Sequence, residues 1–197
     1  MFENLLCQIT DYDPEIIQPL IELAIEIARE GREGRRIGTL FTFGDEGAVL
    51  ATSRPLILDP LACHPDSARH MSDPNLRGTI KELAQLDGAF VVSGSGVFVA
   101  ACRYPNIAAA SDLQLPLGLG SRHLAAAGIS SITSAIGIVV SESSIVRVFC
   151  HGKLVAEIIP ELWLLSRGNI HLQGPITEER IRDLAVITPK PDFGRPK

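Results

Sequence analysis

Clusters of basic residues are missing from this 197-residue sequence. It holds 18 Lys and Arg against 23 Asp and Glu, a formal net charge of −5, and no basic run exceeds Arg35-Arg36. A protein that neutralises the phosphates of DNA or RNA needs clustered Lys and Arg. We therefore expect no nucleic acid as the main partner.

Long hydrophobic runs are also missing. None of the apolar runs approaches the roughly 18 residues that a bilayer-spanning helix requires. Residues 1–20 contain several acids and a proline and lack the basic start of a secretion signal. We expect a cytoplasmic protein with no membrane partner.

Cysteine is sparse, with four in the chain, and no two of them stand in a Cys-x-x-Cys spacing. This spread argues against a zinc ribbon and against a small secreted domain stapled by disulfides. Cys63-His64 with His70 lacks a second ligand pair, so metal ligation there is disfavoured.

Hydrophobic residues are abundant. They make up 46% of the sequence, and charged residues make up 21%. This composition excludes intrinsic disorder and favours one domain with a sizeable core.

The order of the apolar segments predicts an α/β fold. Helices are expected after Asp13-Pro14 and Asp73-Pro74, because Asp caps a helix and Pro suits its first turn, and after the Gly-rich turn, from about residue 122 to 134. Strands are predicted at residues 37–43, 48–52, 89–93, 97–101, 136–141, 145–150 and 154–159. We expect a mixed central β-sheet flanked by helices in a single domain over residues 1–160. Residues 161–197 are predicted to form a partly loose C-terminal extension, with a short helix starting at Thr177–Arg180.

Asp87 stands where a helix meets a buried strand, in the run Leu86-Asp87-Gly88-Ala89. A carboxylate there needs a partner, because burying an unpaired charge is costly. Asp87 is therefore either a cap of the preceding turn or a functional group at the edge of the strand. Gly88 suits a close backbone approach or an ordinary turn.

A second cluster, Gly118 to His123, precedes a helix. Backbone N–H groups at a helix start, with glycine, a hydroxyl and an Arg, can cradle a phosphate. The alternative is that Ser121 is only the N-cap and His123 only a first-turn residue. Neither a Walker A motif nor a dinucleotide-binding fingerprint is present. Ser141-Glu142, at the end of a hydrophobic strand, is either a solvated strand exit or a contact with metal or phosphate.

Together these motifs resemble the diadenylate cyclase (DAC) domain, which also occurs in DNA integrity scanning proteins. The resemblance rests on Asp-Gly-Ala at 87–89 and on Arg122-His123-Leu-Ala-Ala behind Gly120-Ser121. Residues 37–45, 73–89 and 139–154 resemble flanking segments of the same family in the same order. The similarity covers roughly residues 10–160.

The resemblance implies an enzyme that condenses two ATP molecules into cyclic di-AMP and two pyrophosphates with Mg²⁺ or Mn²⁺, in a homo-oligomer with facing active sites. Asp87 would lie near the ribose 3′-hydroxyl and the metal, and Glu142 would be a second metal contact. The nucleotide would be bound by Gly88, Ala89, Gly120, Ser121, Arg122, His123, Ser141 and Glu142, with Asp87, Arg122 and His123 catalytic. Because Ser143 stands where members often carry a second acid, the alternative is a catalytically weak nucleotide-binding module of the same fold.

Overall fold

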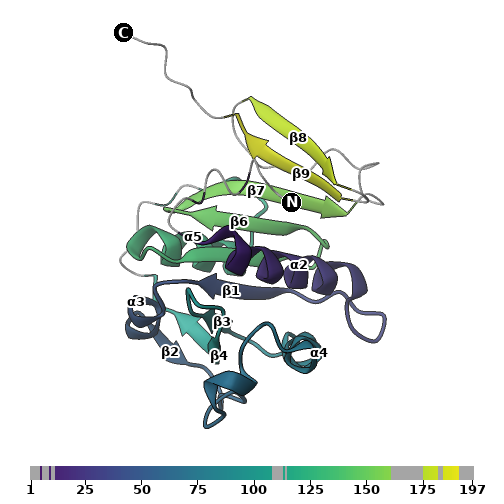
Figure 1. Ribbon diagram of the computed structural model, residues 1–197. Helices are drawn as coiled ribbons and strands as arrows, with labels where there is room; N and C mark the ends of the chain where they lie inside the picture. The colour runs from purple at the N-terminus through teal and green to yellow at the C-terminus, as the bar shows by residue number, and fades with distance from the viewer. Residues whose placement is uncertain are drawn as a thin grey trace.

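Strands from much of the chain join one sheet. The computed structural model describes residues 5, 9, 12–107, 113, 115–160, 175–181 and 184–190. The nine strands in these residues follow the order β2-β4-β3-β1-β5-β6-β7-β9-β8 (Figure 1). They are β1 (Thr39–Phe43), β2 (Ser53–Pro55), β3 (Ala89–Val92), β4 (Phe98–Pro105), β5 (Ile136–Val140), β6 (Val146–Cys150), β7 (Lys153–Pro160), β8 (Ile176–Ile181) and β9 (Leu184–Pro189). Because β1 pairs with β3 in parallel and with β5 antiparallel, the sheet is mixed, and the predicted fold class is confirmed.

Helices cover both faces of this sheet (Figure 1). They are α2 (Pro14–Glu30), α3 (Glu46–Ala51), α4 (Pro74–Leu83) and α5 (Ser121–Ile132), with a 3₁₀ turn at Asp66–Ala68. The Asp13 and Asp73 carboxylates each accept a hydrogen bond from a backbone N–H in the first turn, at 2.9 and 2.8 Å, so both predicted caps are confirmed.

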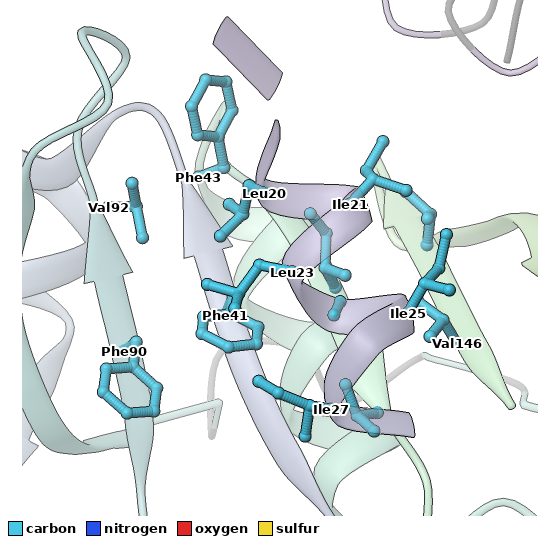
Figure 2. Packing of buried hydrophobic residues seen from close by; sticks show 14 of the residues in the cluster. Leu20, Ile21, Leu23, Ile25, Ile27, Phe41, Phe43, Phe90, Val92 and Val146 are labelled. Atoms are coloured by element: carbon cyan, nitrogen blue, oxygen red, sulfur yellow. The ribbon is translucent and has the colours of Figure 1, made fainter. Parts of the chain in front are cut away.

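The core follows from the alternation of side chains along β1. Phe41 and Phe43 face α2, where Figure 2 shows them beside Leu20 and Leu23. Leu40 points to the opposite face and packs against Ala126 and Ala127 of α5. Each fully buried Leu, Ile or Phe contributes about 1.5–3 kcal/mol. Burial on both faces therefore fixes the register of the central strand.

The predicted strand at residues 48–52 is wrong. The chain turns through left-handed conformations at Gly44 (φ 77°) and Asp45 (φ 44°) and then forms the helix α3. Val49 is the buried residue of this helix. A short apolar run has no periodicity that separates a strand from a buried helix turn, and here the turn after β1 decides.

The predicted helix at Thr177–Arg180 is also wrong, because these residues lie in β8. β8 pairs with β9 over six residue pairs, from Ile176↔Pro189 to Ile181↔Leu184, and β9 pairs with β7. Pairing to an existing sheet edge overrides the modest helix propensity of Glu and Arg. Of the predicted extension, residues 161–174, 182–183 and 191–197 lie outside the described residues, and the domain boundary at 160 stays a prediction.

The helices in the described residues are too short or too polar to span a membrane. None of them is both long and apolar enough to cross a bilayer.

A polar clasp joins α2 to α4. Arg77 donates from Nε and Nη2 to the two carboxylate oxygens of Glu26, at 3.0 and 2.7 Å. Lys81 Nζ lies 2.7 Å from the same carboxylate. The hydrogen bond from Arg77, with help from Lys81, lowers the pKa of Glu26 although partial burial opposes the shift.

The clasp predicts a pH-dependent contribution to stability. A carboxyl whose pKa is lowered by folding stabilises the protein above its unfolded pKa, and this contribution is lost as the pH falls through the folded pKa. Glu26→Gln should lower the free energy of unfolding by about 1 kcal/mol or less at pH 7, because the pair is partly exposed. Urea denaturation should show the difference shrinking towards pH 3. An equal difference at pH 7 and pH 3 would contradict the assignment.

Candidate functional site

A pocket of about 410 Å³ opens between the start of β3, the end of β4 and the start of α5. Its size is that of a small-molecule site. It is lined by Leu40, Leu56, Asp87, Gly88, Ala89, Arg103, Tyr104, Pro105, Ile107, Ser121, Arg122, Leu124 and Ala125. The two sequence clusters, one before β3 and one at α5, therefore meet in one cavity.

Gly88 lets β3 and β4 approach closely beneath Asp87. Its φ is +104°, and a Cβ there would lie 2.6 Å from the carbonyl carbon of Cys102. Only glycine adopts this conformation without strain and leaves room for that backbone. The predicted close approach is thus present, and it places Asp87 at the rim of the pocket.

Arg122 lies between two carboxylates. Its Nη2 is 3.9 Å from Asp87 Oδ1, and its Nη1 donates to Glu142 Oε1 at 3.2 Å. The side chains of Asp87, Glu142 and Arg122 are 81%, 69% and 38% exposed. Such exposed pairs are weak, so Arg122 can exchange these partners for a ligand. Within the described part of the chain the Asp87 carboxylate caps no turn, and it lies beside the Arg122 guanidinium, which favours its functional interpretation.

The guanidinium has room because residue 38 is glycine. A Cβ at Gly38 would lie 2.6 Å from Arg122 Nη1 and 3.3 Å from Glu142 Cγ. Sequence analysis did not identify Gly38, because the residues next to it do not indicate a contact with a helix that begins more than eighty residues later. Only the pairing of β1 with β5 brings the start of β1 to the Glu142 turn.

The start of α5 presents backbone N–H groups at the pocket. Gly120 is the N-cap in extended conformation, so the alternative of Ser121 as N-cap is wrong. Ser121 is the first helical residue and lines the pocket with its neighbour Arg122. The first N–H groups of a helix have no intrahelical acceptor, and the helix dipole favours an anion there. This geometry supports the predicted phosphate cradle.

His123 is placed differently. It is buried, does not line the pocket, and lies behind the first turn of α5. Its Nδ1 is 3.2 Å from the backbone nitrogen of Gly120, and its Nε2 is 3.1 Å from Arg147 Nη1. The predicted direct contact of His123 and Gly120 with a nucleotide stays a prediction.

Ser141 closes the turn between β5 and β6. Its Oγ donates to the carbonyl of Ile145 at 3.0 Å and accepts from the Ile145 N–H at 3.2 Å. Its other contact is Ser143 Oγ at 2.6 Å. These bonds hold Ser141 in the turn, and its predicted contact with a nucleotide stays a prediction, whereas Glu142 reaches the site through Arg122.

Tyr104 and Arg103 also line the pocket and were missed, because the predicted strand ended at residue 101 while β4 continues to Pro105. Arg103 donates to the carbonyls of Leu50 and Ser53 at 3.0 and 2.6 Å, which ties β4 to the end of α3 and the start of β2. Tyr104 is half exposed, with the Arg54 guanidinium 4.9 Å from its ring centre.

Cys102 lies beneath Gly88 at the floor of the pocket. Burial raises the pKa of its thiol, and the negative charges of Asp59 and Asp87 raise it further. The thiol is therefore neutral at pH 7 and is a packing residue beneath Gly88.

Metal ligands at this site would have to be oxygen atoms. No group of three or more His, Cys, Asp or Glu side chains gathers in the part of the chain that was searched. Asp87 and Glu142 offer two carboxylates on either side of one guanidinium. Mg²⁺ is commonly bound by one or two carboxylates together with substrate phosphates, so this pair fits a cation that arrives with a phosphorylated ligand.

The chain matches a known protein family. Residues 26–154 match the DAC family, described as the DisA bacterial checkpoint controller nucleotide-binding domain. The matched range contains the Asp87 and Gly120–Arg122 clusters and the Glu142 turn.

Two similar proteins are named diadenylate cyclase. The one from Methanocaldococcus jannaschii is 49% identical over 150 residues, which are 76% of this chain and 47% of that protein. The one from Haloferax volcanii is 42% identical over 152 residues, 77% of this chain and 55% of that protein. The chain thus spans about half the length of these relatives.

A solved structure has the same fold. It is that of a hypothetical membrane spanning protein from Bacillus cereus, with a TM-score of 0.51 and 20% identity, and the match covers 70% of this chain and 61% of that one. At this identity the likeness shows the architecture of the sheet and its helices.

The tight floor of the pocket is testable. Gly88→Ala should lower the free energy of unfolding by about 2 kcal/mol or more, because it strains a positive φ and forces apart β3 and β4. Gly47→Ala is the matched control, since a Cβ on that helical glycine meets nothing within 4 Å. Thermal and urea denaturation of both variants would measure the effect. Equal stability of the two variants would contradict the close approach.

Proposed function

This chain belongs to the DAC family, and on that premise we propose that it is a diadenylate cyclase that joins two ATP molecules into cyclic di-AMP. The observation that carries the proposal is the single pocket in which Asp87, Ser121 and Arg122 meet. It combines a carboxylate, a hydroxyl, a guanidinium and the start of a helix. These are the groups that nucleotidyl transfer needs for binding phosphates and for neutralising charge.

The proposed reaction makes two equivalent bonds. The 3′-hydroxyl oxygen of each ATP attacks the α-phosphorus of the other. The bond from that phosphorus to the oxygen bridging to the β-phosphate breaks, and pyrophosphate leaves with its electron pair. Each hydroxyl loses one proton, which Asp87 is placed to accept or orient. Two ATP molecules thus give one cyclic di-AMP, two pyrophosphates and two protons.

Different residues of the pocket would serve different parts of this reaction. Arg122 and the N–H groups at the start of α5 would bind the phosphates and stabilise the negative charge that develops on them. Asp87 would orient the 3′-hydroxyl from the opposite rim. The apolar side chains of Leu40, Leu124 and Ala125 line the cavity and would pack against the nucleoside.

We include Mg²⁺ or Mn²⁺ in the proposal, with Asp87 and Glu142 as the residues that would hold it. Such a cation, when bound, lowers the pKa of a coordinated hydroxyl and neutralises phosphate charge. The fit rests on the two exposed carboxylates that flank Arg122. A phosphate that binds Arg122 would replace Asp87 and Glu142 as its partners and leave both carboxylates available to the cation.

A homodimer is part of the proposal. Asp87, Ser121 and Arg122 of one chain line one pocket, whereas the product needs two attacks in opposite directions, which two facing copies related by a twofold axis would supply. Large apolar side chains exposed at or near the pocket, Tyr104, Leu124 and Leu117, support an interface there.

The proposal also covers localisation and partners. Because ATP is the proposed substrate, we place the protein in the cytoplasm, with neither nucleic acid nor membrane as partner.

A nucleotide-binding module with weak catalysis is the second candidate. One observation favours it: Ser143 Oγ is engaged with Ser141 Oγ at 2.6 Å, where a second acid would add a carboxylate. Such a module would bind ATP and release little pyrophosphate.

Incubation with ATP and Mn²⁺ or Mg²⁺ over a range of protein concentrations tests the proposal, with nucleotides separated by chromatography and identified by mass spectrometry. We expect cyclic di-AMP, with specific activity that rises with protein concentration. Asp87→Asn should lower turnover by at least about a hundredfold, the range of general acid-base effects, while ATP affinity changes little.

The matched control is Asp66→Asn, an acid paired with Arg69 on the 3₁₀ turn and absent from the pocket lining. It should leave turnover unchanged. Recovery of intact ATP alone from the parent protein that nevertheless binds ATP would leave the binding module as the function. Normal turnover by Asp87→Asn would remove Asp87 from the site.

Arg122 is predicted to act mainly in phosphate binding. Arg122→Ala should raise the KM for ATP roughly tenfold to a hundredfold, since a charged hydrogen bond contributes about 1.5–3 kcal/mol. Arg32→Ala, which breaks the exposed pair with Glu82, is the control and should leave KM unchanged. Steady-state kinetics would measure both variants, and an unaltered KM in Arg122→Ala would disprove phosphate binding by Arg122.

A further inference from the structure

A buried chain of charged and polar groups lies behind the pocket. Glu157 is 0% exposed, Arg147 3% and His123 7%. Arg147 Nε donates to Glu157 Oε1 at 2.6 Å, and Arg147 Nη1 is 3.1 Å from His123 Nε2. The imidazole continues to the backbone nitrogen of Gly120, 3.2 Å from Nδ1. The chain therefore connects β7 and β6 to the first turn of α5, in which His123 lies.

The sheet register places this chain in one cross-strand row. Leu40 pairs with Val139, Val139 with Arg147, and Arg147 with Glu157. Glu157 in turn pairs with Ile187 of β9. Cross-strand partners lie on the same face of a sheet, so the ion pair stands on the α5 face, between the apolar side chains of Val139 and Ile187. The same row begins at Leu40, in the lining of the pocket.

An ion pair in such a row is not explained by stability. Removing two charges from water is costly, and replacing a buried pair with apolar residues of similar volume is often neutral or stabilising. Stability alone therefore does not account for Arg147 and Glu157, and a polar side chain that Arg147 also contacts is the ring of His123.

Two hydrogen-bond donors, Arg147 Nη1 and the Gly120 N–H, lie beside the two nitrogens of the His123 ring. A guanidinium only donates, and so does a backbone N–H, whereas a neutral imidazole has one acceptor nitrogen. The bond from the charged Arg147 is the stronger of the two, because charge-assisted hydrogen bonds are about twice as strong as neutral ones. Nε2 of His123 then accepts, and the ring proton lies on Nδ1. A doubly protonated ring is disfavoured by the adjacent guanidinium.

We propose that Arg147, oriented by Glu157, is a positioning residue that fixes the ring of His123 and with it the first turn of α5, which presents Ser121 and Arg122 to the pocket. The proposal deepens the proposed function and rests on it for its kinetic consequence. Its structural consequence, the location of the ring proton, is independent of any activity.

The test uses the full chain and the double variant Arg147→Met with Glu157→Leu, which removes both charges and keeps the volume. We expect near-parent stability. Nitrogen-15 NMR of the imidazole, assigned by loss of its signals in His123→Gln, should show the proton moving from Nδ1 to Nε2 as Nδ1 begins to accept from Gly120. The KM for ATP should rise roughly tenfold with a smaller change in kcat, the result of a misplaced binding group.

Two variants serve as comparisons. Arg147→Lys keeps a cationic donor beside Glu157 and should retain the proton on Nδ1 with a KM close to that of the parent. Arg77→Met removes the bidentate pair of Arg77 with Glu26, on the α2 face. It should lower stability and leave the ring proton and KM unchanged.

A double variant that folds with the proton still on Nδ1, or with an unchanged KM, would overturn the proposal. Should it not fold, Glu157→Gln is measured in the same way, because it keeps the volume and withdraws the charge that orients Arg147. A raised KM would then support the proposal and an unchanged one would overturn it. If the parent neither binds nor converts ATP, the proposed function fails, and the position of the ring proton still decides the role of Arg147.

Discussion

The fold and the pocket both depend on β1 being buried on its two faces. Phe41 stacks on Phe90 at a ring distance of 5.1 Å under α2, while Leu40 packs against α5 and lines the pocket. A shift of one residue in its register would exchange these two sets of side chains. Because β1 also pairs with β3 and β5, its register sets where Asp87 and Glu142 lie. Packing of the core and assembly of the site are thus the same constraint.

Patterns within one element predicted the fold well where the element carries its own signal. The Asp-Pro starts of α2 and α4 and the apolar runs of β5, β6 and β7 need no distant partner to be recognised. The two wrong segments, 48–52 and Thr177–Arg180, are short and obtain their structure from neighbours. A left-handed turn at Asp45 starts α3, and an antiparallel partner at 184–189 makes β8 a strand. Neither cause is visible in the local sequence.

The same distinction between local signals and distant partners applies to the residues of the site. Residue type and position singled out Asp87, Ser121 and Arg122 as candidates, and the structure brings the three to one pocket. Sequence could not show that Glu142 reaches the site through Arg122, or that Gly38 leaves room for it, because both depend on strand pairing across the sheet. The orientation of His123 away from the cavity depends on a partner in β6. Motifs reveal which residues carry chemistry, whereas the register decides which of them face a ligand.

Two arginines show why burial matters to the chemistry. Arg122 is 38% exposed, and its two carboxylate contacts are 3.2 and 3.9 Å long in partly solvated surroundings, so a phosphate can replace them at little cost. Arg147 is bound at 2.6 Å to a carboxylate fully withdrawn from water, and its partners cannot be exchanged without leaving a charge unpaired. Arg122 is therefore suited to bind a ligand reversibly. Arg147 is suited to hold the first turn of α5, on which the position of Arg122 depends, and neither arginine could replace the other.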